Sequence, residues 1–207
     1  MELYKHDNYD WYVAVQKKLT AKKVRMAKAG KFFKSWVGRK ALRNINDMIH
    51  TYTDPKTIVC HGCRLGVEVA VLQKLNPDSL VFGTDIYGDG YAYDKTYFRE
   101  MDFDTVPDEW KGYFDVIYSN SLDHSRNPIN TLLAWKSELR PEGIMFINFH
   151  WGRGISREDC FHLDSTNWRE EVLEIAREIG MDVLYISDPK LFADGANYTD
   201  VILKKCR

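Results

Sequence analysis

The chain has 207 residues, of which 44% are hydrophobic and 29% are charged. This length suits one domain with a sizeable core and one short appended segment, and the composition is typical of a globular protein. No apolar run approaches the roughly 18 residues that a membrane span needs, and the N-terminus lacks the apolar core of a secretory signal. We therefore expect a cytoplasmic protein with no membrane partner.

The four cysteines are too few and too scattered for a disulfide framework. Cys60 and Cys63 form a C-x-x-C pair, which is a spacing of metal and redox sites, but no second pair completes a zinc site. We expect reduced, structural thiols and no bound metal.

Positive charge is concentrated near the N-terminus. Residues 1–43 hold twelve lysines and arginines against three acids, a net charge of +9, whereas the whole chain has a net charge of −1. Within residues 10–28, apolar side chains recur near helical spacing among the lysines, which predicts a basic amphipathic helix. The apolar stripe is Tyr12, Val15, Leu19 and Met26, and the aromatic cluster that follows is Phe32, Phe33, Trp36 and Val37.

Two interpretations of this segment stand, and they are compatible. Residues 1–40 form a cover that packs its apolar stripe on the main core, or they form a lid over a ligand site. The charge would attract an anionic substrate such as nucleic acid or a phosphorylated metabolite.

From residue 41 onward, helical and strand patterns alternate. Asn127-Pro128 is a strong helix start, Asn167 and Glu170 form a capping pattern, and Pro141-Glu142-Gly143 predicts a turn into the next strand. Helices are expected over 41–52, 67–75, 127–139 and 167–179, and strands over 57–61, 80–84, 97–101, 114–120, 144–149, 181–187 and 200–204.

This alternation predicts an α/β fold, a Rossmann-like doubly wound sheet of about seven mostly parallel strands with helices on both faces. We divide the chain into the helical segment 1–40 and a domain over 41–207.

Residues 57–66 organise the domain. A buried strand breaks at Gly62, and Gly66 precedes the next helix. Asp85 ends the following strand, about 20 residues further on. A glycine turn that opens a helix, followed by such an acid, is the nucleoside-binding arrangement of doubly wound folds.

These residues resemble the class I S-adenosylmethionine-dependent methyltransferases, small-molecule branch, over residues 41–207. Residues 58–66 match the first and third glycines of the family's first motif, while Cys60 replaces its acid and Arg64 its middle glycine. Residues 101–103, the strand over 114–120 and Leu-Arg-Pro-Glu-Gly at 139–143 resemble later motifs, in the family's order.

The resemblance implies S-adenosyl-L-methionine as cofactor and S-adenosyl-L-homocysteine as product. Amides at a helix N-terminus and the cation of Arg64 would favour the cofactor's carboxylate, and an ionised Asp85 would accept hydrogen bonds from its ribose diol. The implied cofactor-binding residues are His61, Gly62, Arg64, Gly66, Asp85, Ile86, Asp102, Phe103 and Asn120.

Methyl transfer to a hydroxyl requires an aligned nucleophile and removal of its proton. Loops beyond the carboxyl ends of the strands should supply these groups. The first candidate for a base is His124, with Asp123 beside it in sequence, and the second is His150.

We expect methyl transfer to oxygen or nitrogen of a small molecule or sugar-like metabolite. The alternatives are a nucleic-acid methyltransferase that uses the basic segment and a non-catalytic cofactor-binding or scaffolding protein. An NAD dehydrogenase also fits the glycine turn and Asp85, although that carboxylate would repel the 2′-phosphate of NADP.

Overall fold

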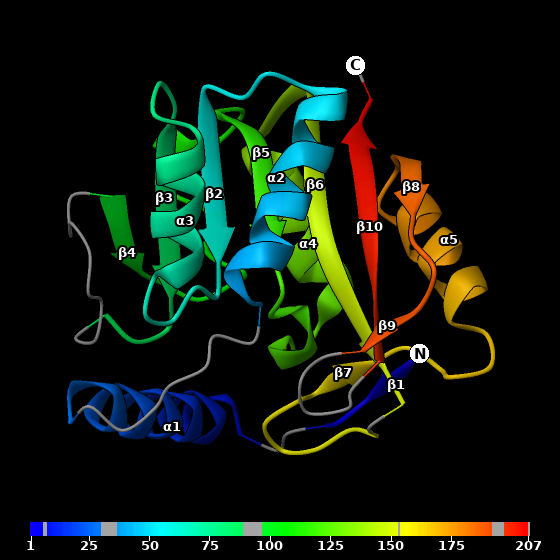
Figure 1. Ribbon diagram of the computed structural model, residues 1–207. Helices are drawn as coiled ribbons and strands as arrows, with labels where there is room; N and C mark the ends of the chain where they lie inside the picture. The colour runs from blue at the N-terminus through cyan, green and yellow to red at the C-terminus, as the bar shows by residue number, and fades with distance from the viewer. Residues whose placement is uncertain (6–7, 30–36, 89–96, 153, 192–196, 207) are drawn as a thin grey trace.

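Figure 1 shows the protein as a computed structural model, which describes residues 1–5, 8–29, 37–88, 97–152, 154–191 and 197–206, without the side chains of residues 27 and 28. Phe32, Phe33 and Trp36 of the expected aromatic cluster lie outside the described residues. Among the described residues, no helix is long and apolar enough to cross a membrane.

A mostly parallel sheet forms the centre of the molecule, in the order β4-β3-β2-β5-β6-β10-β8. Strand β10 is antiparallel to both β6 and β8, and the short β9 (Lys190–Leu191) pairs with β10. The seven ordered strands are β2 (Thr57–His61), β3 (Leu80–Asp85), β4 (Phe98–Glu100), β5 (Phe114–Ser119), β6 (Leu139–Trp151), β8 (Met181–Ile186) and β10 (Asn197–Lys205). The predicted α/β sheet is therefore confirmed.

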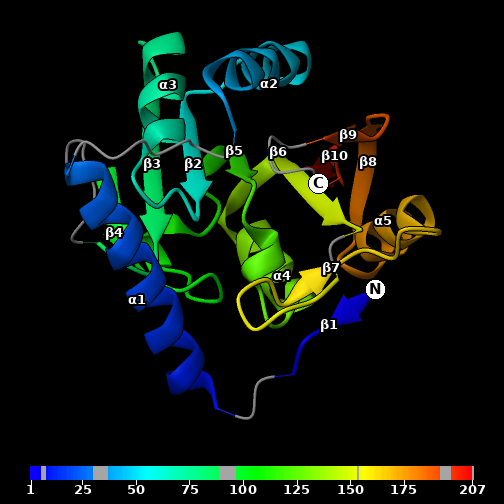
Figure 2. The same ribbon diagram turned by 60° about the horizontal axis from the view of Figure 1, so that its bottom comes forward.

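Helices cover both faces of this sheet (Figures 1 and 2). Helices α2 (Arg39–Tyr52) and α3 (Val67–Leu75) lie on one face, and α4 (Pro128–Glu138) and α5 (Trp168–Glu178) on the other. Successive side chains of a strand point to opposite faces. In β2, Val59 accordingly packs under α4, while Ile58 and Cys60 pack under α2 and α3.

Two local predictions need correction. Strand β6 begins at Leu139 rather than at residue 144, and the expected turn is an irregularity inside it, where Glu142 has a left-handed φ of 66°. Asn127 caps α4 as expected, since its Oδ1 accepts from the Asn130 amide at 3.2 Å. The side chain of Asn167 makes no such bond at α5. Instead, the Asp164 amide donates to Glu171 Oε2 at 2.9 Å.

Three short strands were not predicted, namely β9 and a pair that involves the N-terminus. Strand β1 (Glu2–Leu3) pairs with β7 (Phe161–His162) in a separate two-stranded sheet. Such short segments carry too little periodicity to be recognised in a sequence.

Helix α1 (Tyr9–Lys28) lies across the carboxyl ends of the parallel strands (Figures 1 and 2). The predicted apolar stripe is wrong apart from Tyr12, because Val15 and Leu19 are only half-buried and Met26 is 41% exposed. The buried positions are Tyr12, Gln16, Thr20 and Val24. Three of these four side chains are polar, so this face of α1 covers something other than a purely apolar core.

Candidate functional site

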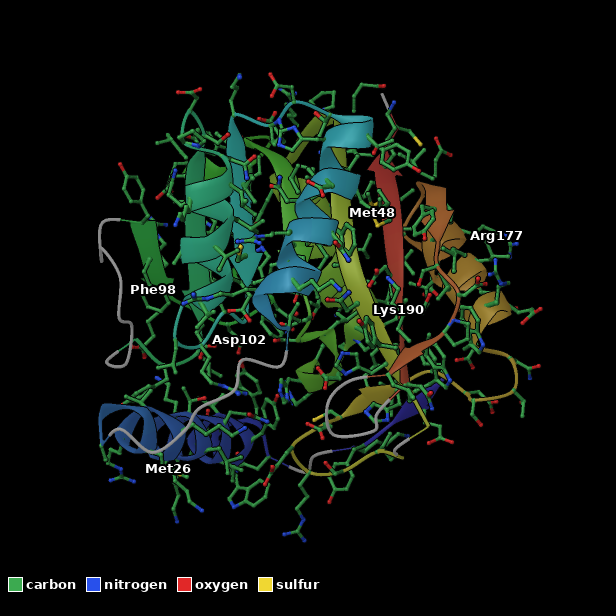
Figure 3. All side chains as sticks on the ribbon, in the orientation of Figure 1. Met26, Met48, Phe98, Asp102, Arg177 and Lys190 are labelled. Carbon is green, nitrogen blue, oxygen red and sulfur yellow. The ribbon has the colours of Figure 1, made fainter. Side chains whose placement is uncertain are left out.

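A cavity lies between the carboxyl edge of the sheet and α1. It encloses about 610 Å³ of space free of protein atoms, including its open mouth. Figure 3 places Asp102 in this region, between the sheet and α1. From the sheet side the lining is Gly62, Arg64, Asp85, Ile86 and residues 101–104; from α1 it is Tyr9, Tyr12, Gln16 and Thr20; from the segment after β5 it is Ser121, His124, Ser125, Arg126 and Thr131.

The glycine turn between β2 and α3 has a left-handed backbone at three positions, with φ of 71° at Gly62, 46° at Arg64 and 74° at Gly66. Glycine adopts this conformation without steric cost, whereas another residue loses about 1–2 kcal/mol. Arg64 therefore accepts strain at the position where the motif has its middle glycine. Cys60 and Cys63 beside the turn are buried free thiols, and burial raises the pKa of both.

Asp85 ends β3 and is 6% exposed. Its Oδ2 accepts from the Arg64 amide at 2.8 Å and its Oδ1 from the Tyr87 amide at 3.2 Å. Burial raises the pKa of the Asp85 carboxyl, while the Arg64 cation and the two amides oppose that rise. A carboxylate has about four acceptor positions, so Asp85 retains capacity to accept hydrogen bonds from a diol in the cavity.

A partly apolar slot lies beside Asp85 and is made by Ile86, Met101 and Phe103. The Phe103 ring is fixed edge-on against Trp135, with 5.3 Å between ring centroids. Asp102 lines the same slot, and burial and then the neighbouring Asp104 raise the pKa of its carboxyl. Apolar side chains, one of them an aromatic ring, together with a carboxyl suit a heteroaromatic ring that carries an amino group.

His124 lies at the cavity on the short 3-10 turn Leu122–His124 that follows β5. Its Nδ1 is 2.8 Å from the Glu158 carbonyl oxygen and 3.4 Å from Asp159 Oδ1. Since a carbonyl oxygen only accepts, Nδ1 carries the hydrogen, and Nε2 of the neutral ring holds the lone pair. Helix α1 contacts the same group, because Tyr12 Oη donates to the His124 carbonyl and Gln16 Nε2 to the Glu158 carbonyl at 2.9 Å.

Asp123 and His150 form a hydrogen-bonded pair beside this group, with 3.0 Å between Asp123 Oδ2 and His150 Nδ1. Burial alone would raise the pKa of Asp123, but His150, His124 and His162 hold it below its ordinary value. Metal-ligand atoms of Asp123, His124 and Asp159 lie within 4.8 Å of one another. The ammonium group of Lys23 is close enough to interact with both carboxylates, although burial and then Arg64 lower its pKa.

The structure brings together Gly62, Arg64, Asp85, Ile86, Asp102, Phe103 and His124 of the candidate residues. Among the described residues, Gly66, Asn120, Asp123 and His150 do not line the cavity. Asn120 directly precedes Ser121 and Asp123 directly precedes His124, both of which line it, and His150 pairs with Asp123. His61 points into the core, where its Nδ1 is 2.9 Å from Thr84 Oγ1 and its Nε2 is 2.9 Å from Glu138 Oε2. The imidazole of His61 therefore cannot contact a ligand in the cavity.

Three groups of the site were not predicted from the sequence. Gln16 and Thr20 follow Tyr12 at helical spacing, so a polar stripe was present but was outweighed by the apolar one. Asp159 comes from a segment without periodicity. Arg126 follows His124 by two residues, so its position in the segment after β5 was an available signal for a site residue.

The sheet order and the position of the cavity define the fold of the class I methyltransferases. Among solved structures, the chain is similar to 1,6-didemethyltoxoflavin-N1-methyltransferase from Burkholderia thailandensis, solved with 1,6-didemethyltoxoflavin and S-adenosylhomocysteine. The identity is 16% and the TM-score 0.72, over 99% of this chain and 94% of that one.

It is also similar to geranyl diphosphate C-methyltransferase from Streptomyces coelicolor, at 11% identity and a TM-score of 0.65 over 94% of this chain and 97% of that one. The [4+2]-cyclase SpnF has 13% identity and a TM-score of 0.71, over 99% and 98% of the two chains. The sequence matches no family model and no curated protein. At these identities the likeness shows the fold alone. SpnF is named as a cyclase and the other two proteins as methyltransferases, so the fold does not by itself give the reaction.

Proposed function

We propose that the protein is an S-adenosylmethionine-dependent methyltransferase acting on oxygen or nitrogen of a small polar molecule. The observation that carries the proposal is one cavity, at the carboxyl ends of the strands, that joins Asp85, the slot around Phe103 and Arg64. These groups match the ribose diol, the adenine ring and the carboxylate of the cofactor. The similar structures solved with S-adenosylhomocysteine support this assignment.

The polar side chains of the cavity have the chemistry that the cofactor requires. Asp85 keeps acceptor capacity for the diol, and Asp102, beside Phe103 in the lining, would accept from the adenine amino group. No hydrogen bond or ion pair within the described chain engages the Arg64 guanidinium, which leaves it for the carboxylate. When bound, S-adenosylmethionine supplies a methyl group that an acceptor lone pair takes from the sulfonium, while the electron pair of the broken bond stays on sulfur.

His124 is the base in this proposal. Its Nε2 lone pair accepts the proton that the acceptor hydroxyl or amine gives up, and the Glu158 carbonyl and Asp159 hold its Nδ1–H in place. Positioned general bases contribute about 10²–10⁴-fold to rate. His150 lies outside the cavity lining, so it is the weaker candidate and, with Asp123, supports the turn that carries His124.

Helix α1 acts as a cover over the reaction in this proposal. Tyr9, Tyr12, Gln16 and Thr20 on α1 close the side of the cavity opposite the sheet. A closed site excludes water, which strengthens the electrostatic interactions inside it. The polar character of this face supports a polar acceptor rather than a hydrocarbon.

Calorimetry with S-adenosylhomocysteine tests the cofactor assignment. We expect saturable binding by the wild type and at least about tenfold weaker binding by Asp85→Asn, because charge-assisted hydrogen bonds contribute about 1.5–3 kcal/mol. Glu178→Gln, at an exposed position, is the control. Absence of binding by the wild type would remove the enzyme assignment.

Radiolabelled S-adenosylmethionine and a polar metabolite extract then test catalysis. Transfer of label that His124→Gln lowers by about 10²-fold or more, with binding retained, supports the role of the base. Cofactor binding without any transfer would support the non-catalytic alternative.

A nucleic-acid acceptor is the second candidate, favoured by the exposed basic face of α1, which includes Lys18, Lys22 and Arg25. Binding through phosphates would weaken steeply with salt. Filter binding at low salt that detects no RNA or DNA retention would exclude this candidate.

A further inference from the structure

Arg126 carries a charge that nothing in the described chain neutralises by direct contact. It lines the cavity and is half-buried. Among the described residues, no hydrogen bond or ion pair engages its guanidinium group. A charged group taken partly out of water is costly unless it is paired, so an arginine left in this state indicates a partner outside the chain.

Two aromatic rings of α1 fix the orientation of Arg126. Its Cζ lies 4.0 Å from the centroid of the Tyr9 ring and 5.9 Å from that of Tyr12. Stacking on a ring uses the flat face of the guanidinium and leaves the N–H groups at its edge available. These donors form a rigid fork that matches the two oxygens of a carboxylate or phosphate.

The acidic residues of the cavity do not supply that partner. Burial and then Asp104 raise the pKa of Asp102, and the charge of Arg126 opposes this rise only as a smaller effect. Among the described residues, Arg126 forms no ion pair with Asp85, Asp102 or Asp104. These three acids come from the segments assigned to the cofactor, whereas Arg126 follows His124 and faces α1.

We propose that Arg126 recognises an anionic group of the methyl acceptor, a carboxylate or a phosphate, while His124 removes the proton from the reacting atom of the same molecule. This inference rests on the proposed methyltransferase function and narrows it to an acidic, hydroxyl- or amine-bearing acceptor. Arg64 would bind the carboxylate of the cofactor and Arg126 the anionic group of the methyl acceptor, so each arginine of the cavity has its own anion. The α1 cover completes the anion site, because Tyr9 and Tyr12 orient its donor.

The test uses two probe anions, inorganic phosphate and acetate, titrated at fixed ionic strength into the full chain with and without saturating S-adenosylhomocysteine. We expect saturable binding of at least one anion by the wild type and a loss of about tenfold or more in Arg126→Gln. Arg126→Lys keeps the charge but not the fork, so it should bind with intermediate affinity. The anion bound more tightly identifies the acceptor as a phosphate or a carboxylate.

Arg157→Gln is the matched control. Arg157 also stacks on an aromatic ring of α1, with its Cζ 5.6 Å from the Trp11 centroid, but it does not line the cavity. Its substitution should leave anion binding unchanged. Three outcomes would overturn the inference. The wild type and Arg126→Gln could bind the anions with equal affinity, Arg126→Gln and Arg157→Gln could lose affinity equally, or the wild type could show no saturable binding.

The cofactor arm separates this inference from the proposed function. If S-adenosylhomocysteine binds the wild type and Arg126→Gln equally but neither protein binds the anions, only the assignment of Arg126 fails. If S-adenosylhomocysteine does not bind, the proposed function fails, and the titration without cofactor still decides whether Arg126 holds an anion. If Arg126→Gln lowers the circular dichroism signal, Arg126→Lys, which keeps a positive charge beside Tyr9, replaces it as the test variant.

Discussion

His61 and Glu138 form a hydrogen-bonded pair sealed in the core, with side chains 1% and 0% exposed and 2.9 Å between Nε2 and Oε2. The imidazole also stacks on Trp135, at 4.7 Å between centroids and 9° between planes. Removing one member of such a pair leaves the other buried without its partner, which costs about 3–5 kcal/mol. His61→Leu keeps the apolar volume but removes both hydrogen bonds, so we expect a loss of this size.

Thermal unfolding followed by circular dichroism measures this loss. For a chain of this length, about 2–4 °C of melting temperature corresponds to each kcal/mol, so His61→Leu should melt roughly 6–20 °C below the wild type. The double variant His61→Leu/Glu138→Met replaces the whole pair by apolar groups. It should recover most of the loss, because an apolar replacement of a buried pair is often neutral.

Glu178→Met is the matched control, because Glu178 ends α5 as Glu138 ends α4, but it is exposed. Its substitution should change the free energy of unfolding by less than about 0.5 kcal/mol. The reasoning is refuted if His61→Leu is tolerated as well as this control. It is also refuted if the double variant loses the sum of the two single losses, since the pair would then have no coupling energy.

Three further predictions concern the cavity. Gly62→Ala should lower the free energy of unfolding by about 2–4 kcal/mol, since the φ of Gly62 is +71° and the added Cβ would lie 2.5 Å from Ser121 Cβ. Urea unfolding measures this loss, and if Ser121→Gly in the same chain restores no stability, the contact with Ser121 is not the cause. As the pH is lowered, affinity for S-adenosylhomocysteine should begin to fall above the ordinary carboxyl pKa of 3.8, because burial raises the pKa of Asp85 and protonation removes an acceptor. Calorimetry across pH should show a smaller fall for Asp85→Asn, in which Asp102 still titrates. Equal falls in the wild type and in Asp85→Asn would contradict the assignment of Asp85. EDTA should leave label transfer unchanged, because His124 Nδ1 already donates its hydrogen to a carbonyl and so has no lone pair for a metal ion. If EDTA abolishes transfer and Mg²⁺ restores it, Asp123, His124 and Asp159 hold a metal ion instead.

The core pair also connects stability to the site. His61 directly precedes Gly62 of the glycine turn, and its partner Thr84 directly precedes Asp85, with 2.9 Å between His61 Nδ1 and Thr84 Oγ1. The imidazole therefore fixes the ends of β2 and β3 relative to each other, just below the two groups assigned to the cofactor. Under the proposed function, the side chain of His61 therefore positions the cofactor-binding segments.

The sequence alone determined the sheet domain, because its signals are local. Strands β2 and β5 are short apolar runs, and proline and glycine punctuate the connections between the elements. Strand β2 and helix α3 agree with the predicted ranges at both ends. The glycine turn and Asp85 were also recognisable, since a strand, a tight turn, a helix and an acid follow one another within 30 residues.

Only the tertiary structure decided which polar side chains share the cavity. Helix α1 is separated by about a hundred residues from His124, so its buried face could not be known until the helix was placed across the sheet. A helix that covers a polar cavity buries Gln16 and Thr20, whereas periodicity arguments expect an apolar stripe. His61 illustrates the same limit, because its neighbours Thr84 and Glu138 come from β3 and α4, and only their packing sends the imidazole into the core.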